Sequence, residues 1–315
     1  ALAAGNSVII KPSEAASLVA AALLEVIHPG TLEIPQGLIS LLHGDAAMIS
    51  DTIMQSQTVR KISFTGSTRV GKLLFEKCAS TLKRMSLELG GNAPFIVTGA
   101  ADLEQASTDL VLAKTRNNGQ ICVAPNRVIV QRDIHDAFME KVIQKAKQVS
   151  GGNPLDASKR YGPLINEAAV RRINGLLEDA RSKGARIVYQ ERLDFSCRNM
   201  FPLTIVDGIH SSMNIYYEEI FGPVIASYCV DTIEACIEEA NHTEYGLAAY
   251  LYTRDPQEIT RISAALETGL VGINTTVVST VETPFGGVKN SGIGLENGKY
   301  GLREFQNVTL FSESM

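Results

Sequence analysis

Short runs of apolar and β-branched residues alternate along the chain with longer segments in which apolar residues recur at helical spacing. This alternation is typical of a sheet of parallel strands joined by helices. In the first part of the chain it predicts strands over Val8–Ile10, 37–42, 61–64 and 85–89. It predicts helices over 15–27, 47–55 and 68–79. Ser13 or Glu14 stands near the start of the first helix, where a capping oxygen is favoured.

A second block with the same alternation follows. Its strands are predicted over 95–97, Arg127–Gln131, 186–189, 203–206, Val224–Val230, 248–253 and 270–274. Its helices are predicted over 102–114, 135–149, Glu167–Ser182, 232–240 and 256–266. Residues 285–301 are rich in glycine. A last strand-like run over 308–311 has no local partner, and it completes a sheet either in this chain or in a partner subunit. Strand–helix repeats of this kind bind ligands at the carboxyl ends of their strands.

Length and composition narrow the class of protein. A chain of 315 residues predicts more than one domain, because single cores stop growing at about 250–300 residues. With 45% hydrophobic residues, 20% charged residues and a net charge of −5, it shows no sign of a nucleic-acid or anionic-membrane surface. No apolar run approaches the ~20 residues needed to cross a bilayer. We therefore expect a soluble protein without nucleic-acid or membrane partners.

The five cysteines stand at positions 78, 122, 197, 229 and 236, with no C-x-x-C pair. This scatter argues against a zinc site and against a disulfide framework. It fits a reducing compartment, so we expect a cytoplasmic protein without a metal site, in which a free thiol is available as a nucleophile.

The chain opens on Ala1, without an initiator Met, and runs at once into an apolar stretch. No basic segment with a cleavage site precedes that stretch, as a signal peptide would require. We expect from this that the chain begins inside a folded domain.

Gly66 and Gly71 lie between a predicted strand and a predicted helix, where backbone N–H groups can approach a phosphate. The segment nearly matches a Walker A loop, but Leu73 stands where Ser or Thr must hold magnesium, which disfavours an NTPase. The G-x-G-x-x-G of a standard dinucleotide fold is also missing. The alternative is a plain strand–helix turn.

Two further segments carry candidate chemistry. Glu88 ends a strand beside Gly90 and Gly91, where partial desolvation would raise its pKa toward that of a useful base. The alternative is a solvated acidic residue before a turn. Cys122 follows a polar loop that contains Gly119, where backbone N–H donors favour a thiolate and later an oxyanion. The alternative, an inert buried thiol, is the interpretation we give to the other four cysteines.

Taken together, in this order and at this spacing, these segments resemble the aldehyde dehydrogenase superfamily. The matching motifs are IKPSE (10–14), FTGS (64–67), ELGGN (88–92), GQIC (119–122), EEIFGP (218–223), YGLAA (245–249) and PFGGVKNSG (284–292). The resemblance covers the whole chain. It implies an α/β fold with an incomplete parallel-sheet cofactor domain, an α/β catalytic domain and a C-terminal oligomerisation strand.

The same resemblance implies the domain limits. Residues 1–91 would form the C-terminal part of the NAD(P)-binding domain, and residues 92–290 the catalytic domain. Residues 291–315 would return to the cofactor domain and supply the oligomerisation strand. A homodimer or homotetramer is implied for the full-length protein.

In such enzymes a cysteine, here Cys122, attacks the aldehyde carbonyl, and hydride passes to the nicotinamide to leave a thioester. A glutamate, here Glu88, then activates the water that hydrolyses the thioester. The family's oxyanion asparagine falls upstream of Ala1. Loss of one oxyanion donor typically costs about 10²–10³ in kcat, so a protein made only of these residues is expected to be weakly active or inactive.

The resemblance places Lys11, Ser13 and Glu14 at the adenosine ribose of the cofactor. A carboxylate at Glu14 would repel a 2′-phosphate, so we expect NAD rather than NADP, although Lys11 and Ser13 could partly accommodate that phosphate. The other residues matched to the cofactor are Phe64, Thr65, Gly66, Ser67, Gly71, Leu89, Glu219 and Phe221. Glu296 matches a second glutamate that relays protons; the alternative is a surface residue in a glycine-rich turn.

Segments 89–97, 272–274 and 278–280 resemble the succinate-semialdehyde dehydrogenase branch. Arg116 and Ser279 match residues that hold the far carboxylate of the substrate in that branch, and a guanidinium suits a carboxylate because its N–H groups bind as a fork. Phe285 is matched to the substrate pocket. The small-molecule aldehyde would then be succinic semialdehyde or a related semialdehyde.

Three departures from the branch stand out. Leu295 replaces a usual arginine, residues 275–277 differ from its commoner loop, and Ala124 replaces its second cysteine, which excludes a local redox disulfide. A broad aliphatic or lactaldehyde-type dehydrogenase, and an inactive truncated form that serves only as a binding scaffold, remain the alternatives.

Overall fold

The computed structural model describes residues 1–27, 35–195 and 197–315, and these fall into two compact units. Unit 1 comprises Ala1–Glu88, Ser279–Phe285 and Ile293–Met315, and unit 2 comprises Leu89–Val278 and Gly286–Gly292.

Unit 1 contains two small parallel arrangements of strands. Strand β1 (Val8–Ile10) pairs with β2 (Ile39–Leu41), and β3 (Lys61–Thr65) pairs with β4 (Arg84–Glu88). The short β14 (Gly292–Ile293) lies next to β4. The accompanying helices are α1 (Ser17–Ile27), α2 (Ala46–Gln55), α3 (Thr68–Cys78) and α10 (Gly298–Arg303), with short 3-10 turns at Leu2–Ala4, Glu14–Ala16 and Ala79–Thr81.

Side-chain caps fix where two of these helices begin. The Asp45 carboxylate accepts from the backbone N–H of Met48 at 2.8 Å, at the start of α2. The Ser67 hydroxyl accepts from the N–H of Val70 at 3.4 Å, at the start of α3. Such caps satisfy backbone donors that have no partner in the first helical turn.

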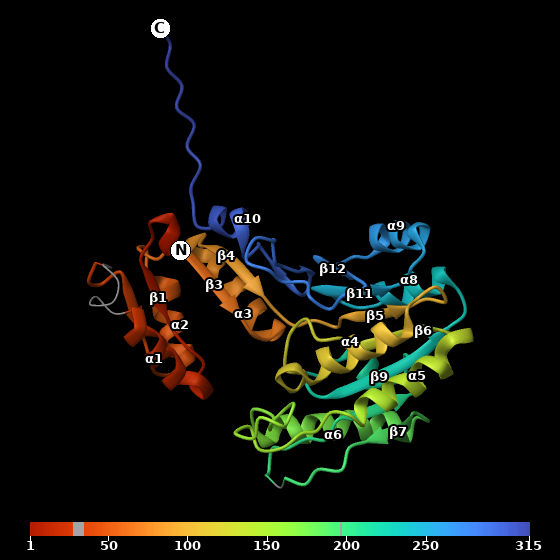
Figure 1. The fold of residues 1–315 in the computed structure, drawn as a ribbon. Helices are drawn as coiled ribbons and strands as arrows, with labels where there is room; N and C mark the ends of the chain where they lie inside the picture. Colours follow the sequence, from red (N-terminus) through yellow and green to blue (C-terminus); the bar gives the residue numbers. More distant parts are fainter. Residues whose placement is uncertain (28–34, 196) are drawn as a thin grey trace. The chain divides into compact units, whose positions relative to one another are not determined.

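Unit 2 is built on a seven-stranded sheet of order β12-β11-β5-β6-β9-β8-β7 (Figure 1). Its strands are β5 (Pro94–Val97), β6 (Arg127–Gln131), β7 (Arg186–Gln190), β8 (Thr204–Asp207), β9 (Val224–Val230), β11 (Ala248–Tyr252) and β12 (Leu270–Ile273). Neighbouring strands are parallel except β7 and β8, which are antiparallel. Strands β5 and β8 are buried along their whole length, which is why their sequences read as continuous apolar runs.

Helices cover both faces of this sheet. One alternating set of strand residues, which includes Ile96 and Ile129, packs with apolar residues of α6 (Glu167–Ser182), α8 (Ile233–Asn241) and α9 (Pro256–Ala265). The opposite face meets α4 (Leu103–Thr115) and α5 (Arg132–Ala146), which lie side by side in Figure 1. The Tyr252 hydroxyl of β11 donates to Asp109 of α4 at 2.8 Å across this second layer.

The predicted strands and helices of both blocks are present, mostly within a few residues of their expected ends. Helix α5 begins three residues before the predicted 135 because it follows β6 directly, with no side-chain cap to mark its start. The sequence pattern missed α7 (Asn214–Tyr217), α10 and the antiparallel pair of β10 (Tyr245–Gly246) with β13 (Val288–Lys289). These elements are too short to show a period.

In two places the structure adds to the sequence pattern. The sheet of unit 2 is not wholly parallel: no helix lies between β7 and β8 in the described residues, so the two strands can pair antiparallel without a crossover. The run over 308–311 is not a strand in the described chain, where Val308 and Leu310 are 100% and 89% exposed. A strand needs a neighbour to pair with its N–H and C=O groups.

Within the described residues, no helix is both long enough and apolar enough to span a membrane. The role of the C-terminal tail in an oligomer stays a prediction.

Candidate functional site

Cys122 lies in unit 2, in a loop with an unusual backbone. After α4 the chain makes a short 3-10 turn over Arg116–Gly119, and Asn117, Asn118 and Gly119 have φ values of 46°, 59° and 70°. This left-handed region is disfavoured for most residues, but glycine enters it freely and asparagine tolerates it. The loop leaves Cys122 partly exposed.

Two glycines allow the backbone to pack closely around the cysteine. A Cβ on Gly119 would stand 2.3 Å from the carbonyl oxygen of Gly222, and one on Gly91 would stand 2.5 Å from that of Cys122. Both distances are well inside van der Waals contact, so neither position accepts a side chain without a shift of backbone.

Tyr250, at the centre of β11, ties the other side of the loop to the sheet. Its buried hydroxyl donates to the carbonyl of Val123 at 2.6 Å. Burial raises the pKa of Tyr250 above its ordinary range; the electrostatic interaction with Cys122 adds to this, and that with Arg116 opposes it. Cys122 and the exposed Arg116 therefore both act on the same phenol, which places the predicted nucleophile and the predicted carboxylate ligand in one neighbourhood.

Glu219, matched to the cofactor ribose, lies in the same unit beside a buried cation. Its carboxylate accepts from the backbone N–H of Gly91 at 3.1 Å. Burial raises the pKa of Glu219 to about 7, while the Gly91 hydrogen bond and the charges of Lys114 and Arg172 act in the opposite direction. Leu89 is buried and Phe221 is exposed in this unit.

Sequence reasoning missed Lys114. Its ammonium group is buried and donates to the carbonyl of Pro125 at 2.8 Å, and burial lowers the pKa of Lys114 to about 7. The residue shares a helix face with the buried Leu110 and Val111. A lysine in such an apolar stripe is the signal that could have identified it.

Glu88 lies at the end of β4, in unit 1, and is only 4% exposed. Its Oε2 atom has no hydrogen-bond partner among the described residues. Burial raises the pKa of Glu88 to about 8, and the charge of Glu296 adds to this effect. Glu296 exchanges backbone hydrogen bonds with Phe285, at 2.9 and 2.6 Å. The two acidic residues singled out in the sequence therefore interact, and burial raises the pKa of Glu296 as well.

The residues matched to the adenosine end of the cofactor follow the carboxyl end of β1. Lys11 and Glu14 form an ion pair at 2.6 Å, and the Ser13 hydroxyl accepts from the N–H of Ala15 at 3.3 Å. Because of the ion pair, Glu14 presents a partly neutralised carboxylate to any ligand.

The glycine-containing turn follows the carboxyl end of β3, in the same unit. Thr65, Gly66 and Ser67 are exposed there, and Ser67 caps α3. A Cβ on Gly66 would stand 2.5 Å from the ring of Phe64, and Gly71 is buried within α3. Carboxyl ends of parallel strands and a free helix N-terminus are the features with which α/β folds bind dinucleotides.

The structure thus places the predicted site residues in two groups. Unit 1 holds Lys11, Ser13, Glu14, Phe64, Thr65, Gly66, Ser67, Gly71, Glu88, Ser279, Phe285 and Glu296, and unit 2 holds Leu89, Arg116, Cys122, Glu219 and Phe221. Ser279 is exposed and Phe285 is half-buried. Their contact with a substrate stays a prediction.

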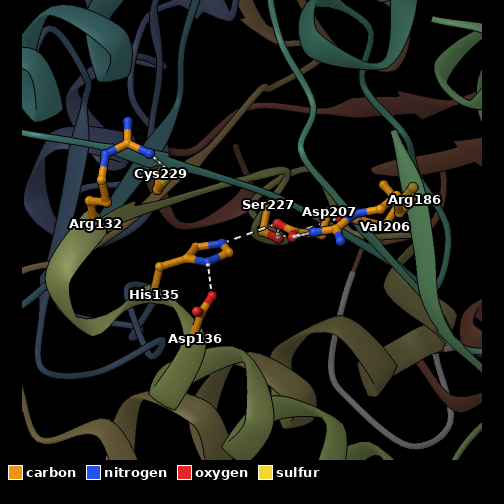
Figure 2. Close-up of polar contacts among 8 residues, drawn as sticks. All are labelled: Arg132, His135, Asp136, Arg186, Val206, Asp207, Ser227 and Cys229. Carbon is orange, nitrogen blue, oxygen red and sulfur yellow. Dashed lines mark hydrogen bonds and ion pairs between the residues drawn. The ribbon is translucent and has the colours of Figure 1, made fainter. Parts of the chain in front are cut away.

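A second polar cluster lies elsewhere in unit 2, between α5 and the strands β7, β8 and β9 (Figure 2). His135 Nε2 lies 3.0 Å from Asp207, which also accepts from Ser227 at 2.9 Å and from Arg186 at 3.2 Å. Asp136 lies 3.2 Å from His135 Nδ1. These contacts join a helix to the sheet, beside a cavity of about 350 Å³.

Residues 1–311 match the sequence profile of the Aldehyde dehydrogenase family. A succinate semialdehyde dehydrogenase of Acinetobacter baylyi is 44% identical over 314 residues, which make up 99% of this chain and 64% of that protein. A succinate-semialdehyde dehydrogenase [NADP(+)] of Escherichia coli is 41% identical, over 98% of this chain and 63% of that protein.

Among solved structures, that of succinate-semialdehyde dehydrogenase from Burkholderia pseudomallei matches with a TM-score of 0.94 at 41% identity, over 97% of this chain and 63% of that one. The chain therefore spans less than two thirds of the length of these relatives.

Proposed function

Because the chain belongs to the aldehyde dehydrogenase family, we propose that it oxidises an aldehyde to a carboxylate through a thioester on Cys122. The observation that carries most weight is Glu88: a buried carboxylate, without a partner on Oε2, whose pKa is raised to about 8. A buried carboxylate with one unpaired oxygen is suited to accept a proton from water near neutral pH.

The protein's residues divide the reaction into two steps. The sulfur of Cys122 forms a bond to the carbonyl carbon, and the electron pair of the carbonyl moves to oxygen, where the Cys122 N–H would stabilise it. A bound nicotinamide would supply the hydride acceptor. Glu88 then takes a proton from water, the resulting hydroxide attacks the thioester carbon, and the carbon–sulfur bond breaks to restore the thiolate.

The residues of unit 1 fit a nicotinamide dinucleotide. Lys11, Ser13 and Glu14 would hold the adenosine ribose, and the turn from Thr65 to Ser67 would hold the pyrophosphate at the start of α3. In unit 2, Glu219 would hold the second ribose. We propose NAD over NADP, because Glu14 can accept from a 2′-hydroxyl but repels a 2′-phosphate; its ion pair with Lys11 weakens this discrimination.

We further propose a semialdehyde with a carboxylate at its far end as the substrate. Arg116 is exposed and close enough to Cys122 for both to act on Tyr250, and its guanidinium suits a carboxylate. Relatives from Acinetobacter baylyi and Escherichia coli are named for succinate semialdehyde. A broad aliphatic aldehyde is the alternative substrate class, and it predicts no dependence on Arg116.

The test measures reduced cofactor formed from succinic semialdehyde and from an uncharged aldehyde of similar length, with NAD and with NADP. Cys122→Ser should remove turnover, whereas Cys197→Ser, at another partly exposed cysteine of unit 2, should not. Arg116→Ala should lower kcat/KM about tenfold more for succinic semialdehyde than for the uncharged aldehyde.

Each part of the proposal can fail separately in this experiment. Turnover that persists in Cys122→Ser contradicts the thioester mechanism. Equal losses on the two aldehydes in Arg116→Ala favour the broad aliphatic class. A higher kcat/KM with NADP than with NAD contradicts the cofactor preference.

A further inference from the structure

Hydrogen bonds in both directions join the loop that carries Cys122 to a segment 44–45 residues further along the chain. The Asn118 side chain donates to the carbonyl of Pro163 at 2.6 Å and accepts from the N–H of Gly162 at 2.9 Å. The Gln120 side chain accepts from the N–H of Ile165 at 3.0 Å. Two side chains close to the cysteine thus bind backbone groups of three residues in one short segment.

That segment, residues 161–165, is itself held firmly; we call it the brace. The Tyr161 hydroxyl bonds to Glu191 and accepts from the N–H of Leu203 at 2.7 Å. Leu164 is 2% exposed, and its N–H donates to the carbonyl of Asn199 at 2.8 Å. Every one of these residues belongs to unit 2.

Some hydrogen bonds lie within the cysteine loop itself. Asn117 and Gln120 bond to each other through the Asn117 side chain and the backbone, both at 3.0 Å. Three successive left-handed residues are an unfavourable conformation that persists only where the surroundings impose it. The brace supplies such surroundings, and Asn118, 8% exposed, is the residue that makes both a donor and an acceptor contact with it.

We propose that the brace sets the position of the Cys122 sulfur, and that Asn118 is the positioning residue through which it acts. This inference rests on the proposed function of Cys122 as the nucleophile. Bond formation requires reacting atoms about 3–3.5 Å apart and aligned, and a misplacement of about 1 Å can cost 10²-fold in rate. A loop held at one face by Tyr250 and at the other by the brace meets that requirement.

The sharpest variant is Asn118→Gly in the full chain. Glycine adopts the φ of 59° without strain, so the change removes the two contacts with the brace without a steric clash in the backbone. Asn117→Gly is the matched control, since it relieves an adjacent left-handed residue and removes only a contact inside the loop. Gln120→Met, which removes the contact with Ile165 but not those of Asn118, is the second variant.

We expect Asn118→Gly to lower kcat per folded molecule at least tenfold, with the KM for aldehyde and for cofactor within twofold of the parent. Asn117→Gly should lower kcat less than threefold, and Gln120→Met should lie between the two. Both a structural and a positioning role predict a lower unfolding midpoint, because two partly buried hydrogen bonds are lost. A purely structural role would leave kcat per folded molecule unchanged, and that result overturns the proposal.

A second readout does not depend on aldehyde oxidation. The rate of Cys122 alkylation by iodoacetamide, followed by mass spectrometry of the peptide, should differ at least threefold between Asn118→Gly and the parent, and not between Asn117→Gly and the parent. Equal alkylation rates in all three proteins overturn the brace. If the parent alkylates normally but does not oxidise aldehydes, the proposed function fails while this arm still tests the brace.

Discussion

Burial decides the chemistry available to Glu88. A carboxylate in water is ionised above about pH 4 and is a weak base. At the end of β4 it is 4% exposed, and burial together with the charge of Glu296 raises its pKa to about 8. Desolvation disfavours the charged form, and a second negative charge disfavours it further. Because burial destabilises the ionised form, an ionised Glu88 removes a proton from water more readily than a solvated carboxylate does.

This gives a pH-dependent prediction for catalysis. Deacylation by the parent should accelerate as pH rises through about 8, since only ionised Glu88 accepts a proton. Glu88→Gln should keep a burst of about one reduced cofactor per Cys122 and lose steady-state turnover by about 10²–10⁴-fold. Rapid-mixing kinetics from pH 6 to pH 9.5 measure both phases. A steady-state rate in Glu88→Gln that keeps the parent's pH profile would assign the base to another group.

The raised pKa of Glu88 also makes folding stability depend on pH. The dependence has the opposite sign to that of an acid in a salt bridge, whose pKa is lowered. The folded protein holds the Glu88 proton more tightly than the unfolded chain does, so the contribution of this residue to folding is lost as pH rises from about 4.5 to about 8. Glu88→Gln cannot ionise, so the free energy of unfolding of this variant should not fall for this reason over the same pH range.

Between elements, the polar cluster around Asp207 shows how a helix is joined to a sheet. His135 in the first turns of α5 meets Asp207 at the end of β8, and Asp207 also binds Ser227 of β9 and Arg186 of β7 (Figure 2). The hydrogen bond to Asp207 raises the pKa of His135, although burial opposes it, and Asp136 adds to the rise. The pKa of Asp207 falls to about 2, because the hydrogen bonds from His135 and Ser227 outweigh its burial.

We expect His135→Gln to destabilise unit 2 by about 1–3 kcal/mol at pH 5.5, because a buried carboxylate loses a charged partner. A raised folded pKa means that the His135 contribution is fully present below its ordinary value of 6.5 and is lost as pH rises through the folded value. The difference between parent and variant should therefore shrink by pH 9. Urea unfolding at both pH values measures it.

His43→Gln, at an exposed histidine of unit 1, is the control and should show no difference at either pH. A His135→Gln penalty that is the same at pH 5.5 and pH 9 would mean that the contact with Asp207 does not depend on the charge of the histidine.

At the scale of the molecule, each unit is assembled from segments far apart in the chain. Unit 1 combines residues 1–88 with the tail that begins at residue 293. Within it, Lys61 and Glu304 form an ion pair at 3.0 Å, with side chains 11% and 24% exposed, and the Arg84 guanidinium donates to the carbonyl of Gln306 at 2.6 Å. The tail thus closes on β3 and β4 before it becomes extended.

Glu304→Gln should accordingly weaken unit 1 and leave unit 2 unchanged. The largely buried Lys61 would lose its charged partner, at a cost of about 1–3 kcal/mol. Hydrogen exchange should then show faster exchange in β3 and β4, with no change in β5 and β6. Glu313→Gln, further along the extended tail, should change neither. Faster exchange in both units would contradict the division of the chain into two.

The sequence by itself determined the local elements and indicated Cys122 and Glu88 as candidate reactive residues. Strand-like and helical periods can be recognised in segments of a few to fifteen residues. These local patterns predicted the longer strands of both units. Cys122 and Glu88 were found from their local glycine-containing settings and the resemblance that those motifs carry. Their chemical roles stay predictions.

Tertiary structure decided the contacts between residues that are far apart in the sequence. The left-handed run at Asn117 to Gly119 is held by a segment 45 residues away, His135 meets Asp207 across 72 residues, and Lys61 meets Glu304 across 243. The raised pKa of Glu88 likewise depends on burial and on Glu296, and the antiparallel β7 depends on its pairing with β8. Packing brings these groups together only after the chain has folded, so no local pattern records them.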